Sequence, residues 1–427
     1  MLKFKFQFLL PVAIFLISGI LYGCDDDSNT IFDPDKEMDP DPEIQQVVPE
    51  NEAFAGVGSV TLEGIEPVVI YGENFGNDKD RVDVYFGESQ AEVLELHEDR
   101  VLVTPPDDPG EERKIRVSVI GAEKYSEVDY ELVPIFETFP GLEDADEPRG
   151  MTTDPDGVLY AANIVSDAFD GVDRFFQDGS SEKIIEPENW SYLRLRHGPD
   201  DAIYLLRGGT IPIVYRAEEG QDSPDVISGP AHGLALQDLD FDSNENLWTG
   251  GLNHGDDDQD ILRIDIYGDP NDPEHFRFEG DIHAIRAYQG DLYVSAQRYE
   301  DDDANDPNQS GVWRLPIDGN DELVDEELFV EMPDPEEYIR KITFTEAGQL
   351  VAATTTAESI YIHRDQELEP LYPGVIPPGA FNFAVSSKDK EQLIVGIQGT
   401  TIDGRISEDK MIILEMNQEM APFYGSR

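Results

Sequence analysis

The sequence is poor in cysteine, in basic residues and in recognisable catalytic motifs. A single cysteine in 427 residues excludes a disulfide framework. The 30 Lys and Arg residues face 92 Asp and Glu residues, and the net charge of −62 argues against binding to nucleic acid or to an anionic lipid surface. No GxSxG elbow, HExxH motif, phosphate-binding loop or CxxC pair occurs, so no standard catalytic signature is present. What is there is 39% hydrophobic residues, enough for a substantial core.

The acidic excess has two physical explanations. A dense layer of carboxylates keeps a protein hydrated at high salt, where the Debye length falls to about 3 Å and self-repulsion almost vanishes. We therefore expect a halophilic source. The alternative is a surface loaded with calcium ions, which would offset the repulsion at low salt.

The amino-terminal segment indicates export. Lys3 and Lys5 precede an apolar run, which is the pattern of a signal peptide over residues 1–23. The run contains Pro11, is short for a hydrocarbon core of about 30 Å, and is followed by acids, which disfavours a membrane-spanning helix. The segment "LYGC" resembles the lipobox of bacterial lipoproteins, which implies acylation of Cys24 and attachment to outer-membrane lipid.

Residues 24–43 predict an extended, disordered tether. Asp and Pro alternate there without apolar periodicity, so the segment cannot bury enough surface to offset its ordering entropy. The acids that follow the cysteine resemble the surface-export signal of lipoproteins in the Bacteroidetes. This implies an outer-membrane protein that faces the extracellular side, with a periplasmic orientation as the alternative.

Residues 44–134 predict a β-sandwich. Short β-rich runs alternate with Gly, Pro and Asn turns, as in "PVVIYGENFG", "RVDVYFGESQAEV" and "RVLVTPP". The "GENFG" and "YFG" turns, with Gly72, Asn74, Gly76 and Gly87, resemble those of IPT/TIG domains. The resemblance implies an immunoglobulin-like fold that acts as a spacer or binding module.

Residues 135–427 contain a sixfold repeat of an apolar strand, a tight polar turn and a second apolar strand, exemplified by "MTTDPDGVLYAAN". Successive copies start 44, 44, 46, 57 and 42 residues apart, the period of a four-stranded propeller blade. The copies start at Met151, Leu195, Leu239, Ile285, Ile342 and Ala384. The stretch "PRGMTTDPDGVLYAAN" resembles NHL repeats, so the expected fold class is all-β, an immunoglobulin-like sandwich followed by an NHL-like six-bladed propeller.

The stretch "DFDSNENLWTG" fits either a calcium loop or a turn. Asp242, Asn244 and Asn246 have the spacing of oxygen ligands, but the sixth position is Leu247 instead of Gly and the twelfth is Asn253 instead of Glu. The repeat places this stretch between the first two strands of a blade. We therefore predict a turn in which the Asx side chains bond their own backbone.

The repeat also predicts a candidate ligand site. Inner strands of propeller blades line a central channel, and ligands commonly bind at its mouth. The aligned copies bring basic and polar residues to the start of these strands, where arginines could hold a carboxylate or phosphate. The alternative is that the cations neutralise nearby acids inside a structural channel. The predicted mouth residues are Arg149, Arg194, Gln237, Asp238, His283, Arg340, Lys341 and Asn382.

Metal binding and catalysis are weaker hypotheses. Two acidic runs after second strands could bind Ca²⁺, with Asp256, Asp257, Asp258, Asp301, Asp302 and Asp303 as candidate ligands, although such runs are usually only solvated. The six-bladed lactonases of the senescence-marker type hold a divalent ion in the channel, but here cations occupy most of the corresponding positions. No catalytic residue is predicted.

These patterns together predict a surface lipoprotein that binds a ligand without a cofactor. The resemblance implies acidic glycans, other nutrients or partner surface proteins as ligands. The alternative is a propeller hydrolase or lyase that acts on a sugar lactone or a polysaccharide.

Overall fold

The computed structural model describes most of the chain from residue 38 onward. The described ranges are 38–49, 60–62, 67–106, 114–133, 136–141, 146–165, 168–176, 179–186, 192–208, 212–218, 220–221, 223–228, 234–253, 261–269, 272–299, 307–364, 366–416 and 418–426. Among these residues no helix is long and apolar enough to cross a membrane. The signal peptide, Cys24 and most of the predicted tether lie outside the described ranges.

The amino-terminal domain is a sandwich of two antiparallel sheets. One sheet has the order β1 (Glu43–Pro49), β3 (Val68–Glu73), β7 (Arg100–Thr104) and β6 (Glu92–His97). The other has the order β5 (Ser89–Gln90), β4 (Val82–Phe86), β8 (Lys114–Val119) and β9 (Ser126–Asp129). A parallel pair, β2 (Val60–Leu62) and β10 (Glu131–Val133), and a 3₁₀ turn, η2 (Lys79–Arg81), complete the domain.

Alternating burial in β4 and β8 fills the space between the two sheets with apolar side chains, as a half-buried strand requires. Gly76 and Gly87 have positive φ in the two turns that the sequence singled out, and Asn74 does too. Asp39, within the segment 24–43 that the sequence predicts as a tether, forms an isolated bridge to Ala122.

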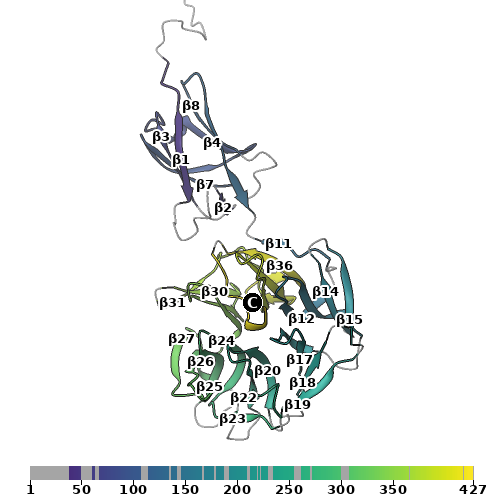
Figure 1. The fold of residues 1–427 in the computed structure, drawn as a ribbon. Coiled ribbons are helices and arrows are strands. Elements are labelled where there is room, and N and C mark those ends of the chain that lie inside the picture. Colours follow the sequence, from purple (N-terminus) through teal and green to yellow (C-terminus); the bar gives the residue numbers. More distant parts are fainter. Residues whose placement is uncertain are drawn as a thin grey trace, which may run out of the picture.

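The carboxy-terminal domain is a ring of six four-stranded antiparallel sheets (Figure 1). The first three blades are β12 (Asp146–Thr153), β13 (Leu159–Val165), β14 (Ala168–Phe175), β15 (Ser181–Ile185); β16 (Tyr192–His197), β17 (Ile203–Arg207), β18 (Ile213–Ala217), β19 (Asp225–Ser228); and β20 (Leu234–Phe241), β21 (Leu247–Asn253), β22 (Ile261–Ile264), β23 (Glu274–Phe276). The fourth and fifth blades are β24 (Asp281–Tyr288), β25 (Asp291–Tyr299), β26 (Pro307–Pro316), β27 (Glu327–Glu331); and β28 (Ile339–Phe344), β29 (Leu350–Thr354), β30 (Ile360–Arg364), β31 (Glu367–Pro370).

The sixth blade closes the ring by pairing strands from distant parts of the chain. Its order is β32 (Ala380–Val385), β33 (Gln392–Ile397), β36 (Lys410–Glu415) and β11 (Phe136–Thr138). The outermost strand thus precedes the first blade in sequence, while the other three come from the end of the chain. A small hairpin, β34 (Thr400–Ile402) and β35 (Arg405–Ser407), is inserted between β33 and β36. The all-β, six-bladed prediction is confirmed.

The Asp242 stretch is a turn, as predicted. Its carboxylate accepts hydrogen bonds from the backbone N–H groups of Asn244 and Asn246, at 2.8 and 3.0 Å. The same carboxylate accepts from the indole N–H of Trp248 at 2.7 Å. These bonds stay within the turn and its own blade, and they account for the acid without a calcium ion.

Candidate functional site

The six inner strands share one irregularity near their first residues. In β12, β16, β20, β24, β28 and β32 the pairing with the second strand skips one residue, so each strand carries a β-bulge at the same height. Bulges re-aim single side chains and are frequent beside functional sites. The six skipped residues are Arg149, Leu193, Gln237, His283, Arg340 and Phe381. We call this ring the mouth.

Burial separates the mouth from the layer below it. Five of the six mouth residues are partly exposed and only Phe381 is buried, whereas the residue on each side of every bulge is buried. Four predicted site residues therefore belong to the mouth: Arg149, Gln237, His283 and Arg340. The other four, Arg194, Asp238, Lys341 and Asn382, each stand one position beyond a bulge and are buried.

The eight residues predicted to surround one opening therefore fall into two layers, four at the bulges and four one position beyond them. A bulge adds one residue to a strand, and aligning the repeats without it shifts the register by one in the second and sixth blades. Leu193 takes the place expected for Arg194, and Phe381 takes the place expected for Asn382. The side chain of Asn382 instead bonds to backbone, donating to the Arg149 carbonyl and accepting from the Phe383 N–H.

Inside the channel, Asp238 is the centre of an ion cluster. Lys341 Nζ lies 2.6 and 2.5 Å from its two carboxylate oxygens, although the two residues come from the third and fifth blades. Arg194 Nε and Arg196 Nη2 lie 3.7 and 4.0 Å from Asp238 Oδ1. Burial opposes ionisation, but the charges of Lys341, Arg196 and Arg194 outweigh it and lower the pKa of Asp238.

A second carboxylate lies one layer deeper. Asp240 accepts from Arg196 Nε at 3.2 Å and from Arg286 Nη1 at 3.0 Å. Side-chain exposure in this layer is 1% or less for all three residues. Arg196, Asp240 and Arg286 were not predicted as site residues. The sequence does contain a pattern that points to Arg196 and Asp240. Each stands two residues after a predicted site residue, Arg194 or Asp238, and residues two apart in a strand lie on the same face.

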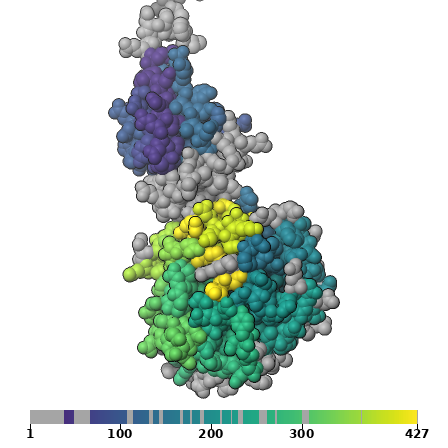
Figure 2. All heavy atoms as spheres, viewed as in Figure 1, coloured from purple at the N-terminus to yellow at the C-terminus, as the bar shows by residue number. Residues whose placement is uncertain are grey.

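The end of the chain closes the channel opposite the mouth. Figure 1 places the carboxy terminus at the centre of the ring, and Figure 2 shows yellow atoms there. The Phe423 ring lies 3.8 Å from the Arg196 guanidinium and 4.1 Å from that of Arg286. Arg286 also donates to the carbonyls of Ala421 and Pro422, at 3.1 and 2.9 Å. Nothing in the repeat pattern predicts this contact, because the segment follows the last blade.

The tail is closely fitted. Its last turn, η3 (Tyr424–Ser426), contacts β16, and Gly425 O lies 2.7 Å from His197 Nδ1. A Cβ at Gly425 would lie 1.7 Å from the His197 carbonyl oxygen, so only glycine fits. The partly exposed residues of the mouth therefore stand at one end of the channel, and the carboxy-terminal tail closes the other end.

The channel carries more positive than negative charge. Below the mouth, four bases, Arg194, Arg196, Arg286 and Lys341, share two acids, Asp238 and Asp240. Burial lowers the pKa of Arg194, and the nearby charges of Arg196, Arg149 and Arg340 lower it further against the pull of Asp238. Burial and Arg196 likewise lower the pKa of Lys341, which Asp238 opposes. Even if Lys341 were neutral, three bases would face two acids.

Two arginines of the mouth differ in how they are held. Arg149 Nε lies 2.7 Å from Glu147 Oε1, and Glu147 also accepts from Gln398. Arg340 has no ion pair among the described residues, and its Nε is buried without a hydrogen-bond partner there. An unpaired buried guanidinium nitrogen is costly, so this residue has unused binding capacity.

Neutral groups complete the mouth. The His283 ring stacks on Tyr338, with centroids 4.1 Å apart, and its Nε2 lies 3.1 Å from Gln297 Oε1. Burial lowers the pKa of His283 to about 4, helped by the charge of Arg340. His283 is thus uncharged at neutral pH and adds an aromatic surface beside Arg340. Gln237 donates to the Ala235 carbonyl at 3.2 Å.

The structure does not describe the six aspartates that the sequence offers as metal ligands. Asp256, Asp257, Asp258, Asp301, Asp302 and Asp303 all lie outside the described ranges. Within those ranges, no three His, Cys, Asp or Glu side chains are grouped so that they could hold a metal ion. In the channel, a divalent ion at Asp238 would have to compete with Lys341, so the donor set there does not suit a metal.

Comparison with known proteins supports the architecture. Residues 42–132 match the family model of the IPT/TIG domain. No curated protein matches the chain significantly. The chain is similar to the solved structure of an auxiliary nutrient binding protein from Bacteroides thetaiotaomicron, with 13% identity and a TM-score of 0.51 over 89% of this chain and 99% of that one.

Enzymes occur among the similar structures as well. A luciferin-regenerating enzyme has 13% identity and a TM-score of 0.51, covering 68% of this chain and 98% of its own. A gluconolactonase from Xanthomonas campestris has 13% identity and a TM-score of 0.49, covering 66% and 89%. Identities this low establish the fold alone. The chain is an all-β protein with an IPT/TIG domain and a propeller, and its similarity extends to both binding proteins and enzymes.

Proposed function

We propose that this protein is a binding module whose propeller holds an anionic ligand, a carboxylate-bearing glycan fragment, at the mouth of its channel. The observation that carries the proposal is Arg340, a mouth arginine without an acidic partner among the described residues. The chain as a whole has a net charge of −62, but at the mouth Arg340 stands above more buried bases than buried acids, so this region is locally positive. Such a concentration of positive potential attracts and orients an anion.

The geometry supports a carboxylate held by guanidinium groups. The pKa of Arg194 is lowered chiefly by burial, and the charges of Arg149 and Arg340 are close enough to lower it further. Guanidinium groups bind carboxylates through paired, charge-assisted hydrogen bonds. The stacked His283 and Tyr338 rings lie beside this position and offer an apolar surface to a sugar ring.

The rest of the chain fits capture at a cell surface. Acylation of Cys24 and the tether would hold the molecule at the outer membrane, facing outward, with the IPT/TIG domain as a spacer. The similarity to an auxiliary nutrient binding protein supports a role in nutrient capture, and an acidic surface of a partner protein could present the same carboxylates. The channel residues favour binding over hydrolysis or elimination, because the buried carboxylates of Asp238 and Asp240 are already paired with bases.

Calorimetric titration of the purified chain with oligogalacturonate, at fixed salt, tests the proposal. Arg340→Ala should weaken binding by about 1–3 kcal/mol, the range for a lost charge-assisted partner, without loss of folding stability. Arg277→Ala is the matched control, since Arg277 is a base after the outer strand of the third blade, away from the mouth. Equal affinities for wild type and Arg340→Ala, or no heat from any anionic oligosaccharide, would refute the proposal.

A further inference from the structure

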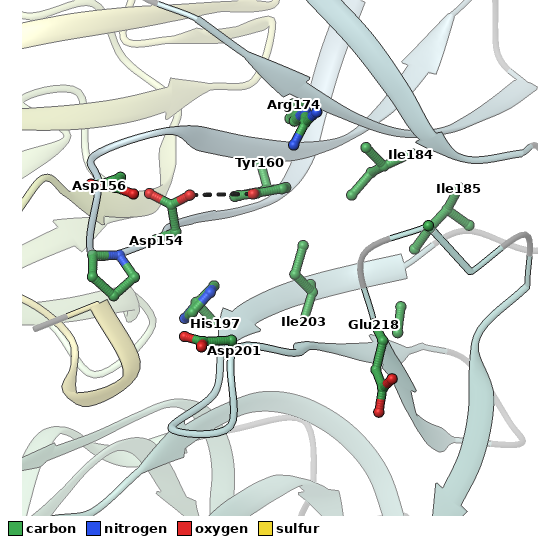
Figure 3. A pocket seen from close by; sticks show the side chains of 13 residues that line it. Asp154, Asp156, Tyr160, Arg174, Ile184, Ile185, His197, Asp201, Ile203 and Glu218 are labelled. Atoms are coloured by element: carbon green, nitrogen blue, oxygen red, sulfur yellow. Dashed lines mark hydrogen bonds between the residues drawn. The ribbon is translucent and has the colours of Figure 1, made fainter.

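A cavity separate from the mouth lies between the first and second blades. Its volume is about 320 Å³, and it opens at the opposite end of the inner strands, where the first two strands of each blade are joined. Figure 3 shows Asp154, Asp156, His197 and Asp201 on one side and Ile184, Ile185 and Glu218 on the other, with Ile203 between them. Pockets of this kind bind small ligands through an apolar surface and a few fixed polar groups.

The polar wall is built from turns of both blades. Asp154 accepts from the Val158 N–H at 2.9 Å and from the Tyr160 hydroxyl at 3.3 Å (Figure 3). Burial, together with the charge of Asp154, raises the pKa of Tyr160 to about 12. Asp156 and Asp201 stand on the same wall. The Tyr160 hydroxyl therefore stays protonated and uncharged. The negative charge of this wall comes from the carboxylates of the three aspartates.

His197 gives the wall a fixed hydrogen-bond acceptor. The residue is only 5% exposed and lines the cavity. Its Nδ1 lies 2.7 Å from the Gly425 carbonyl oxygen, which cannot donate, so Nδ1 carries the hydrogen. In the uncharged form of the ring the lone pair is therefore on Nε2, for which no partner occurs among the described residues. Second-sphere carbonyls orient functional histidines in the same way.

The opposite wall is mainly apolar, although it also carries Glu218, which is paired with Arg216 at 2.6 Å. Ile184 and Ile185 from β15, Ile203 from β17 and Ala217 from β18 form its apolar part. Arg174, which also lines the cavity, is paired with Glu182 at 2.7 Å and interacts with the Tyr160 hydroxyl. The cavity thus offers acceptors and negative charge on one side and a hydrocarbon surface on the other.

We propose that this cavity binds an organic ammonium ion with a short apolar body, such as an alkylamine or a lysine side chain. The ammonium group would donate to His197 Nε2 and to the carboxylates of Asp154 and Asp201, and the methylene groups would pack on the isoleucines. An ammonium donates three hydrogen bonds and cannot accept, which matches the carboxylate and imidazole acceptors of this wall. The described acids are not grouped tightly enough for a bare metal ion, so a larger cation suits the spacing. This inference is independent of the mouth.

Titration of the full chain with n-butylammonium, at fixed pH and ionic strength, tests it. Asp201 has a φ of 59°, which asparagine tolerates, so Asp201→Asn removes the charge without straining the backbone. We expect at least a roughly fivefold rise in the dissociation constant for Asp201→Asn. Asp325→Asn, at an exposed position away from the cavity, should change it less than about twofold. The neutral analogue n-pentanol should not compete.

A direct readout is the ¹⁵N shift of His197 Nε2, which should move on titration with n-butylammonium. A blocked Gly-Lys-Gly peptide then identifies the source: tighter binding of the peptide indicates a protein lysine, and tighter binding of the free amine a small amine. Equal weakening by Asp201→Asn and Asp325→Asn would show that only overall charge matters and would overturn the proposal. So would an unmoved His197 resonance.

Discussion

Removing Asp238 should destabilise the propeller far more than removing its closest partner, Lys341. The two residues are fully buried and in direct contact, so an isolated pair would give similar losses. Breaking a buried ion pair from one side costs about 3–5 kcal/mol because the other charge is left without compensation. Asp238→Asn leaves three bases around a neutral amide, since Arg194 and Arg196 also lie within 4.0 Å of that carboxylate. We expect a loss at the upper end of that range.

Lys341→Met should cost less folding stability than Asp238→Asn. Asp238 keeps Arg194 and Arg196 as counter-charges, so the main loss is the hydrogen bonds from Nζ, about 1.5–3 kcal/mol. The double variant Asp238→Asn with Lys341→Met should be more stable than Asp238→Asn alone, because one uncompensated base is gone.

Urea unfolding followed by tryptophan fluorescence measures these losses. The three tryptophans, Trp190, Trp248 and Trp313, all belong to the propeller sequence, so the signal reports that domain. The difference between the two single variants follows from the midpoints if the slopes agree. A loss for Lys341→Met that equals or exceeds that for Asp238→Asn would refute the account of a cation surplus around Asp238.

The other predictions concern protonation, the tail, the lipid anchor and the surface charge. His283 has a lowered pKa of about 4 in the fold, so the unfolded chain binds its proton first as the pH falls from about 6.5; wild type should lose up to about 3 kcal/mol relative to His283→Gln between those pH values, measured by urea unfolding. Phe423→Ala should cost about 3–5 kcal/mol, and Phe423→Leu less, because leucine fills most of the space but loses the contacts with two guanidinium groups; equal losses would contradict this. Cys24→Ser should release the mature chain from membranes in a fractionation assay, whereas retention would contradict lipid anchoring. The melting temperature should rise from low to molar NaCl as repulsion is screened, and a rise only with millimolar CaCl₂ would favour a calcium-loaded surface instead.

The repeated blades could be read from the sequence because their signal is local. Each copy contains two apolar strands and a polar turn, and in the third blade the turn residue Asp242 bonds its own backbone. Six copies of such a pattern specify six sheets without knowledge of any long-range contact. The IPT/TIG turns were readable for the same reason, since Gly76 and Gly87 have the positive φ that glycine permits.

The sequence predicts only part of the channel. The mouth depends on bulges, and an extra residue in a strand leaves no mark in apolar periodicity, so the sequence does not distinguish Leu193 and Phe381 from their neighbours. The ion cluster depends on which side chains meet across the ring, as Asp238 and Lys341 do from blades that are not adjacent. The Phe423 tail depends on a segment outside every repeat. These contacts are set by ring closure and not by local pattern.

A crystal of the chain soaked with digalacturonate tests the anion site at the mouth directly. We expect one galacturonate carboxylate within hydrogen-bond distance of the Arg340 guanidinium, with its sugar ring beside His283 and Tyr338. Ordered digalacturonate bound away from the mouth, or an unchanged mouth at saturating ligand concentration, would contradict this expectation.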